Sequence, residues 1–138
     1  GKVGGTQLGS GGESAAKEFD EQLKAKGMAG FKELKLFTSY PDSYLGLANG
    51  AVDVVVQPLP NLAVVVKEQA GAFELLGAIG KQSYMGWVTR PEDGDLRDYI
   101  SSKLLEMRDN GHMGMLQDKW FGFRMEIPSE GYLPPGAM

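Results

Sequence analysis

The chain has 138 residues, a length that suits one compact domain with its own core and is short for two domains of ordinary size. Its formal charge of -4 comes from acidic and basic residues spread along the sequence, and the absence of a basic stripe excludes nucleic acid as the main partner. The chain contains no cysteine, which excludes disulfides, thiol nucleophiles and thiolate metal sites.

The first elements are a strand, a glycine-rich turn and a helix. Residues 2–9, "KVGGTQLG", predict a short strand that its two internal glycines weaken. Ser10 and Glu13 have the spacing of a capping box, in which both side chains bind free amide groups at the start of a helix. We therefore expect an amphipathic helix from about Gly11 to Gly27, where glycine can end it in a left-handed conformation.

The next segment repeats this alternation. Residues 31–37, "FKELKLF", predict a second strand. Ser39 and Asp42 repeat the cap spacing and Pro41 suits a first helical turn, so a second helix should run from there to Gly50. Residues 51–57, "AVDVVVQ", form a near-continuous β-branched run, which predicts the central strand of a parallel sheet covered on both faces.

Three further short elements are expected before the pattern changes. Residues 61–69, "NLAVVVKEQ", predict a third helix opened by Pro60. Residues 72–77, "AFELLG", and 84–89, "YMGWVT", predict two more strands. The alternation of strand and helix indicates an α/β fold with a mostly parallel sheet flanked by helices.

A C-terminal helical segment follows. Residues 95–110 predict a long amphipathic helix and residues 113–122 a second, short one, before a tail rich in proline and glycine. Burial of each large apolar side chain contributes roughly 1.5–3 kcal/mol, so the apolar face of the long helix should not stay in water. We expect it to pack against another copy of the chain, as a homodimer that includes exchange of the helical segment. That face carries Leu96, Ile100, Leu104 and Met107.

Four stretches together carry a family resemblance: "VGGTQLGSGGE", "YPDSYLGLANGAVDVVVQ", "YMGWVTRPEDGDLRDYI" and "LQDKWFG". In this order and spacing they resemble the second half of a type 2 periplasmic solute-binding protein that serves a polar amino-acid ABC transporter. The resemblance covers essentially the whole chain up to its tail. It implies that residues 1–90 match the second lobe, without the strand by which the chain normally reaches it. Residues 91–138 then match the C-terminal helices and tail that pack on the first lobe.

The resemblance implies a substrate-binding component of an ABC importer, present here as a fragment. Such a protein closes two lobes around a small polar solute of amino-acid type, which can bear a carboxylate, and docks on a membrane permease. It implies no catalysis, no cofactor and no metal, and a periplasmic location. Residues 1–12 lack the apolar region of a signal peptide and no apolar run approaches the roughly 20 residues that span a bilayer, so we expect a signal to have been removed. Two alternatives stay open: an enzyme on the same fold, such as a dehydratase, and a ligand-inert truncated folding unit.

The turn at residues 9–13, "GSGGE", is the best candidate site. Amide donors at a helix N-terminus attract an anion, and glycines let a ligand approach the backbone. A tight strand-to-helix connection with a capping serine would explain the same residues without a ligand. The resemblance implies that the turn holds a ligand carboxylate and that a nearby glutamine reaches the solute. The expected ligand-binding residues are Gln7, Gly9, Ser10, Gly11, Gly12, Gln57 and Pro58.

Pro58 departs from the family pattern. Most of these receptors carry an aspartate there, which pairs with the ammonium group of the ligand. Proline has neither a charge nor an N–H donor. We therefore expect a solute other than a standard α-amino acid; the alternatives are an ammonium group held by the first lobe and a loss of binding.

Several other residues are better explained by structure than by chemistry. Asp53 should cap or lie on the surface near the start of its strand. His112 lacks the partners of a metal site or a general base and should be solvated. The aromatic residues Trp87, Trp120 and Phe121 and the methionines Met107, Met113 and Met115 are expected to be packing residues.

Overall fold

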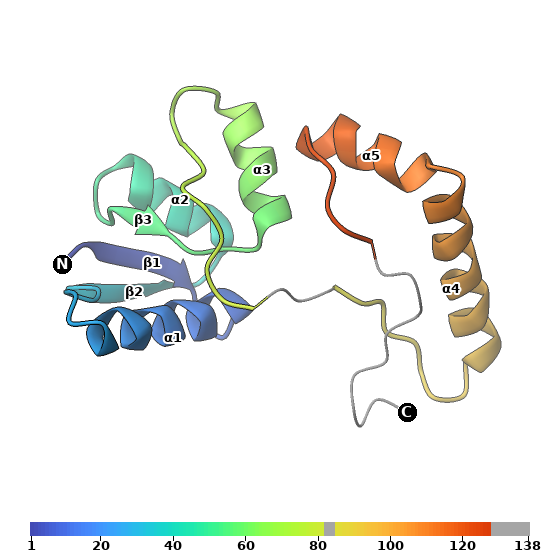
Figure 1. Cartoon of the computed structure of the whole chain (residues 1–138), viewed down its shortest axis with the longest axis horizontal. Coiled ribbons are helices and arrows are strands. Elements are labelled where there is room, and N and C mark those ends of the chain that lie inside the picture. The colour runs from blue at the N-terminus through green and yellow to red at the C-terminus, as the bar shows by residue number, and fades with distance from the viewer. Residues whose placement is uncertain (82–84, 128–138) are drawn as a thin grey trace. The chain divides into compact units, whose positions relative to one another are not determined.

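The computed structural model describes residues 1–81 and 85–127 of the chain (Figure 1). It divides the chain into two compact units, Gly1–Gln82 and Ser83–Met138. None of the helices within the described ranges combines the length and apolarity that crossing a bilayer requires.

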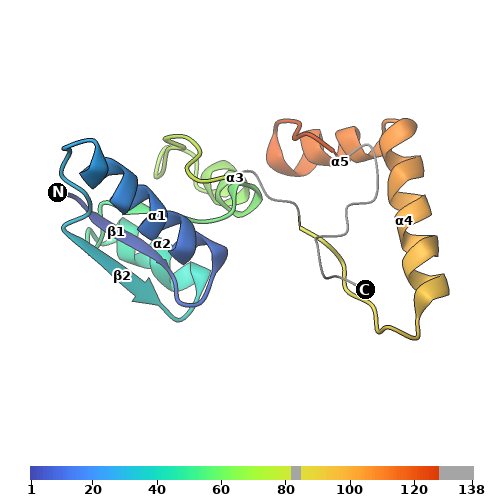
Figure 2. The same cartoon turned by 60° about the horizontal axis from the view of Figure 1, so that its bottom comes forward.

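The first unit is a three-stranded parallel sheet with helices on both faces. Strands β1 (Val3–Gln7), β2 (Glu33–Phe37) and β3 (Val54–Val55) lie in the order β2-β1-β3. Helix α1 (Gly11–Ala25) connects β1 to β2, and α2 (Tyr40–Ala48) connects β2 to β3 on the opposite face of the sheet (Figures 1 and 2). The α/β fold class is therefore confirmed.

The central strand is β1, so the prediction that the valine run is central was wrong. Strand β1 pairs with β2 along its whole length and with β3 through Gly4–Val54 and Gly5–Val55. Among the described residues, β3 pairs with β1 alone and forms an edge. The two glycines suit the central position, because a Cβ on Gly5 would lie 3.0 Å from the ring of Phe37 and 3.2 Å from Val52. Their small size lets neighbouring side chains close over the strand.

The two later strands that we expected do not form in the described part of the chain. After helix α3 (Leu59–Glu68), residues 74–79 and 85–89 have no regular structure, although an isolated bridge joins Ala70 to Phe73. The prediction for residues 84–89 begins at a position outside the described ranges. Strands need a neighbour that binds their backbone groups, and apolar, β-prone residues do not supply one by themselves.

The helix boundaries follow the predicted caps. Ser10 accepts a hydrogen bond from the Glu13 amide, and Ser39 accepts one from the Asp42 amide. Gly27 and Gly50 follow the ends of α1 and α2 with φ angles of 73° and 72°. A residue with a Cβ would be strained in this left-handed conformation, whereas glycine adopts it freely and so ends each helix.

The second unit contains two helices joined at Gly111. Helices α4 (Gly94–Asp109) and α5 (His112–Phe121) confirm both predicted C-terminal helices. No residue of α4 is buried, while Gly114 and Gln117 of α5 are. The proline- and glycine-rich tail falls almost entirely in residues 128–138, outside the described ranges.

The expectation that both tryptophans are packing residues was wrong. Trp87 is 76% exposed and Trp120 is 57% exposed, with the Lys119 ammonium group 5.1 Å from the centre of the Trp120 ring. Met115 is 57% exposed as well, whereas Phe121 is half-buried. His112 is exposed, as expected.

Candidate functional site

The candidate site lies at the carboxyl edge of the sheet. All three strands run parallel, so the segments that follow them leave the sheet at the same edge. The chain moves from β1 outward to β2 and then returns to β3 on the other side, which makes the gap between β1 and β3 a topological switch point. Ligands of open α/β sheets bind beside such points. The segments flanking it, residues 9–12 after β1 and 57–58 after β3, contain most of the expected ligand-binding residues.

Thr6 and Gly12 hold these two segments together. The fully buried Thr6 hydroxyl donates a hydrogen bond of 2.8 Å to the carbonyl of Val56. Gly12 is also buried, and a Cβ there would lie 2.6 Å from the same carbonyl oxygen and 2.7 Å from the Thr6 hydroxyl. Glycine at this position therefore lets the first turn of α1 lie directly against the segment after β3.

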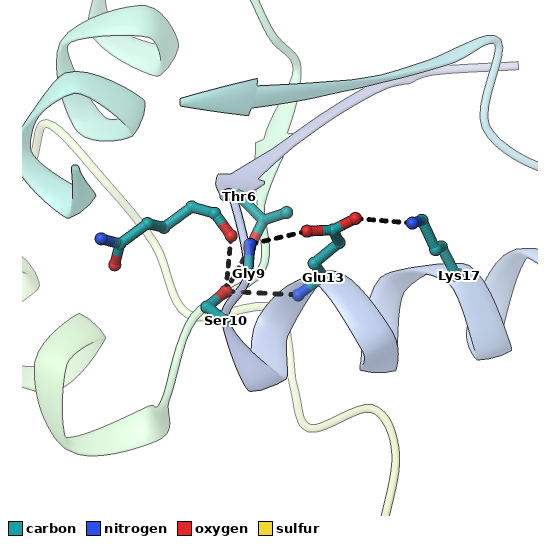
Figure 3. A network of polar contacts seen from close by, with 6 residues as sticks. Thr6, Gly9, Ser10, Glu13 and Lys17 are labelled. Carbon is teal, nitrogen blue, oxygen red and sulfur yellow. Dashed lines mark hydrogen bonds and ion pairs between the residues drawn. The ribbon is translucent and has the colours of Figure 1, made fainter. Parts of the chain in front are cut away.

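The turn before α1 holds an internal carboxylate (Figure 3). Gly9 has a φ of 71° and its amide donates to Glu13 Oε2 at 2.8 Å. The Lys17 ammonium group lies 2.5 Å from the other carboxylate oxygen. The hydrogen bonds from Lys17 and then from the Gly9 amide lower the pKa of Glu13, so its carboxylate is ionised at neutral pH.

Ser10 is fully engaged within the turn. Its hydroxyl donates to the carbonyl of Gln7 at 2.7 Å and accepts the Glu13 amide at 3.3 Å, while its own amide donates to Gln7 at 3.3 Å. The amides of Gly11 and Gly12 make no hydrogen bond in the described structure. Of these two, Gly11 is exposed with open space around it and Gly12 is buried. Gly11 is thus an exposed residue of the turn whose amide has no hydrogen-bond partner in the described structure.

The other expected residues differ in accessibility. The half-exposed side chain of Gln7 donates to the carbonyl of Thr38 at 3.3 Å and links the ends of β1 and β2. Gln57 is only 9% exposed: its amide nitrogen donates to the buried Ser43 hydroxyl at 3.2 Å, and its Oε1 has no partner in the described structure. Pro58 is the N-cap of α3, where its carbonyl accepts the amides of two following residues.

Two groups at this edge were not identified from the sequence. Thr6 gave no indication, because a threonine inside a strand is common and its partner is a backbone carbonyl 50 positions away. Asp42 was recognised only as part of a cap spacing. Its carboxylate accepts the hydroxyls of Ser39 at 2.7 Å and Thr38 at 2.8 Å, and these hydrogen bonds lower its pKa. An ionised carboxylate therefore lies at the head of α2 as well as at the head of α1.

Asp53 lies at the opposite, amino edge of the sheet. Its carboxylate accepts the Val3 amide at 2.8 Å and the Lys2 ammonium group at 2.9 Å, and these contacts lower its pKa. The expected structural role of Asp53 is confirmed. In residues 1–81 and 85–127, no cluster of three histidine, aspartate or glutamate side chains could hold a metal ion.

The chain is similar to arginine-binding proteins. No family model matches it. The arginine-binding periplasmic protein of Mannheimia haemolytica is 26% identical over 93 residues, which cover 64% of this chain and 39% of that protein. A solved mutant of ArgBP from T. maritima is 26% identical, with a TM-score of 0.65 over 88% of this chain and 48% of that one. A solved ancestral arginine-binding protein bound to glutamine is 28% identical, with a TM-score of 0.55 over 88% and 51%.

These matches also define the extent of the similarity. The chain spans 39% of the length of the curated relative and about half the length of the solved proteins. The solved proteins match it over most of its own length, so both of its units contribute to the likeness.

Proposed function

Because the relatives and structural neighbours of this chain are periplasmic amino-acid-binding proteins of ABC transporters, and it matches part of such a protein, we propose that it contributes one lobe of the solute-binding component of an importer. The component binds a small polar solute of amino-acid type between two lobes and delivers it to a membrane permease. It acts in the periplasm, as the relative of M. haemolytica does by its name.

One observation supports the proposal more than any other. The turn after β1 and the segment after β3 meet at the switch point of the sheet, held by the bond from Thr6 to Val56 and by the close approach at Gly12. In this proposal the unbonded amide of the exposed residue Gly11, at the head of α1, supplies a donor for a solute carboxylate, and the helix dipole favours the negative charge. In the same proposal, Gln7 contacts the solute from the end of β1. Gln57 has a structural role beside the site, since its amide donates to the hydroxyl of Ser43.

The loop after β3 offers no carboxylate to the ammonium group of an amino-acid solute. Residues 56–60, "VQPLP", carry no carboxylate, so the loop after β3 cannot form an ion pair with a cation. Either the other lobe binds that group, or the solute is not a standard α-amino acid. The relatives named for arginine support the first possibility, and Pro58 supports the second.

A binding role fits the two carboxylates of the edge better than a catalytic one. A general acid at neutral pH needs a raised pKa, as a dehydratase on this fold would require. Glu13 and Asp42 both have lowered pKa values, because hydrogen bonds stabilise their ionised forms.

A thermal-shift screen tests the proposed function. The chain, and a two-lobed parent protein that contains it, are melted with arginine, glutamine and histidine, and separately with opines and small carboxylates. A solute at 100 times its Kd should stabilise the folded state by about 2.7 kcal/mol. Gly11→Pro, which removes the open amide, should abolish that stabilisation, while Asp53→Asn at the opposite edge should leave it unchanged. A response from the two-lobed protein alone still fits the proposal, because the solute binds between two lobes. No stabilisation of either protein by any solute, or an equal response from Gly11→Pro, contradicts it.

We also propose that two copies of this chain associate through the apolar face of α4. Leu96 is 50% exposed and Tyr99 is 62% exposed, and no residue of α4 is buried within its own unit. Static light scattering over a range of concentrations should give a mass that rises toward twice the monomer mass. A monomer mass at high micromolar concentration contradicts the association.

A further inference from the structure

We infer that Asn110 is a site of spontaneous deamidation, and that the backbone amide of His112 promotes the reaction at the junction of α4 and α5. The reaction needs water as its only co-reactant and releases ammonia, which leaves an aspartate or an isoaspartate residue. The modified residue belongs to the second unit, so the inference does not depend on the proposed function.

The sequence provides the first step, because the chain contains two Asn–Gly pairs, Asn49–Gly50 and Asn110–Gly111. Glycine has no Cβ to hinder attack by its own backbone nitrogen on the preceding side chain. That nitrogen forms a bond to Cγ of the asparagine, and the side-chain amide leaves as ammonia together with the proton of the glycine amide. Water then opens the cyclic imide at either carbonyl, which gives aspartate or isoaspartate. An isoaspartate lengthens the main chain by one carbon atom.

The two asparagines have almost the same local backbone. Each is the exposed C-cap of its helix, with φ and ψ of -87° and 1° at Asn49 and of -84° and 1° at Asn110. The following glycines are both left-handed, with φ of 72° at Gly50 and 78° at Gly111. Each glycine amide donates to a carbonyl of the preceding helix at 3.1 Å. The attacking nitrogen is therefore equally occupied at both sites.

The next amide along the chain distinguishes the two sites. At the end of α2, the amide of Ala51 donates to the carbonyl of Gly46 at 2.8 Å and so closes the helix. At the end of α4, the amide of His112 donates instead to Asn110 Oδ1 at 2.9 Å. The side chain of Asn49 makes no hydrogen bond within the described residues. The electrophilic side chain is thus bound at one site and unbound at the other.

This hydrogen bond assists the attack on Asn110. Negative charge develops on Oδ1 as the nitrogen of Gly111 adds to Cγ, and an N–H group already placed at that oxygen stabilises the charge, as in an oxyanion hole. His112 is the first residue of α5, where the helix dipole also favours negative charge. The same bond directs the Asn110 side chain toward the peptide that follows it. The rate of deamidation should therefore be higher at Asn110 than at Asn49.

The experiment follows both sites in the full chain during incubation in a mildly alkaline buffer. Peptide mapping by mass spectrometry separates them, because trypsin cleaves at Arg108 and Lys119 on either side of Asn110. We expect Asn110 to convert about tenfold faster than Asn49 in the folded chain. In urea the His112 amide is no longer held at Oδ1, so the ratio of the two rates should fall severalfold. His112→Ala keeps the backbone amide and removes the imidazole, and should keep the folded ratio.

Hydrogen exchange of the Gly50 and Gly111 amides provides the control for fraying, since it measures how often each helix end opens. The ratio of deamidation rates should exceed the ratio of opening. The inference is overturned if Asn110 is no faster than Asn49 in the folded chain, if urea leaves the ratio unchanged, or if faster opening at Gly111 accounts for the whole ratio. Loss of the ratio in His112→Ala would assign the effect to the imidazole and overturn the role of the amide.

Discussion

The two units of the chain differ in how much of their secondary structure finds a partner. In the first unit the central strand pairs on both sides, and side chains such as Thr6, Ala16 and Ser43 have no exposed surface. In the second unit α4 has 16 residues and none of them is buried. Helices gain most of their stability from tertiary packing. The comparison therefore indicates that the first unit gains more stability from its own packing than α4 gains from the second unit.

The largest expected loss of stability comes from a substitution that disrupts the close packing of the first unit. Gly12→Ala places a Cβ 2.6 Å from the Val56 carbonyl and 2.7 Å from the Thr6 hydroxyl, and neither belongs to the free end of a flexible side chain. The head of α1 must move away from β3, and we expect a loss of about 2–4 kcal/mol in the free energy of unfolding. Chemical denaturation followed by far-UV circular dichroism measures this loss.

The adjacent glycine provides the control for this substitution. A Cβ on Gly11 meets nothing within 4 Å, so Gly11→Ala should leave stability unchanged or raise it by up to about 1 kcal/mol. The amide signals of α4 and α5 should be the same in both variants. Equal stabilities of the two variants would show that the contact at Gly12 is not a constraint.

A serine in each unit makes the same local bond, which allows a direct comparison. Ser43 donates to the carbonyl of Tyr40 at 2.7 Å, and Ser102 of α4 donates to that of Tyr99 at 2.8 Å. Ser43 is fully buried and also accepts the Gln57 amide, whereas Ser102 is exposed. Ser43→Ala should cost about 1–3 kcal/mol, because it leaves the buried Gln57 amide without an acceptor. Ser102→Ala should stay within about 0.5 kcal/mol of the unchanged protein. Similar losses in the free energy of unfolding at both sites would mean that the difference in burial between the two units has no effect on their stability.

Hydrogen exchange tests whether α4 depends on a second copy. At low concentration the amides of α4 should exchange much faster than those of β1, since no side chain of α4 is buried. Raising the total concentration to about ten times the dimer Kd should slow exchange in α4 by about fivefold, because about a fifth of the chains then remain monomeric, and should leave β1 unchanged. Leu96→Glu should remove this concentration dependence. Exchange in α4 that is slow at every concentration would contradict the comparison on which these predictions depend.

Local sequence patterns predicted the elements of both units well. The cap spacings at Ser10 and Ser39 and the glycines at 27 and 50 located α1 and α2, because they depend on bonds between near neighbours in the chain. The errors concern partners that lie far apart in sequence. The valine run of β3 has the composition of a central strand, but its position depends on which strands lie beside it.

The candidate site shows the same division. Its glycine turn and the capping roles of Ser10 and Glu13 could be predicted, because all of these bonds join residues within four positions of one another. The contact between Thr6 and Val56 spans 50 positions and had no pattern to indicate it. Nor could the sequence alone reveal that the Gln57 side chain is bound to α2, since that depends on how closely the helix approaches the sheet.

The smallest expected difference between the two units is the loss of thermal stability at low pH. In the first unit the pKa values of Glu13, Asp20, Asp42 and Asp53 are all lowered, each by hydrogen bonds to its carboxylate. In the described part of the second unit, the hydrogen bond from Arg124 lowers the pKa of Asp118. A carboxylate with a lowered pKa stabilises the fold above its unfolded value, 3.8 for aspartate and 4.5 for glutamate, and this contribution disappears as the pH falls through the folded value. The melting temperature of the first unit, followed by its amide signals, should therefore fall by a few degrees below about pH 4.5, and that of the second unit by less.

Asp53→Asn should reduce this fall in the melting temperature of the first unit, because the neutral side chain has no charge to lose. An equal fall in both units would mean that these exposed carboxylates contribute no more to the first unit than Asp118 contributes to the second.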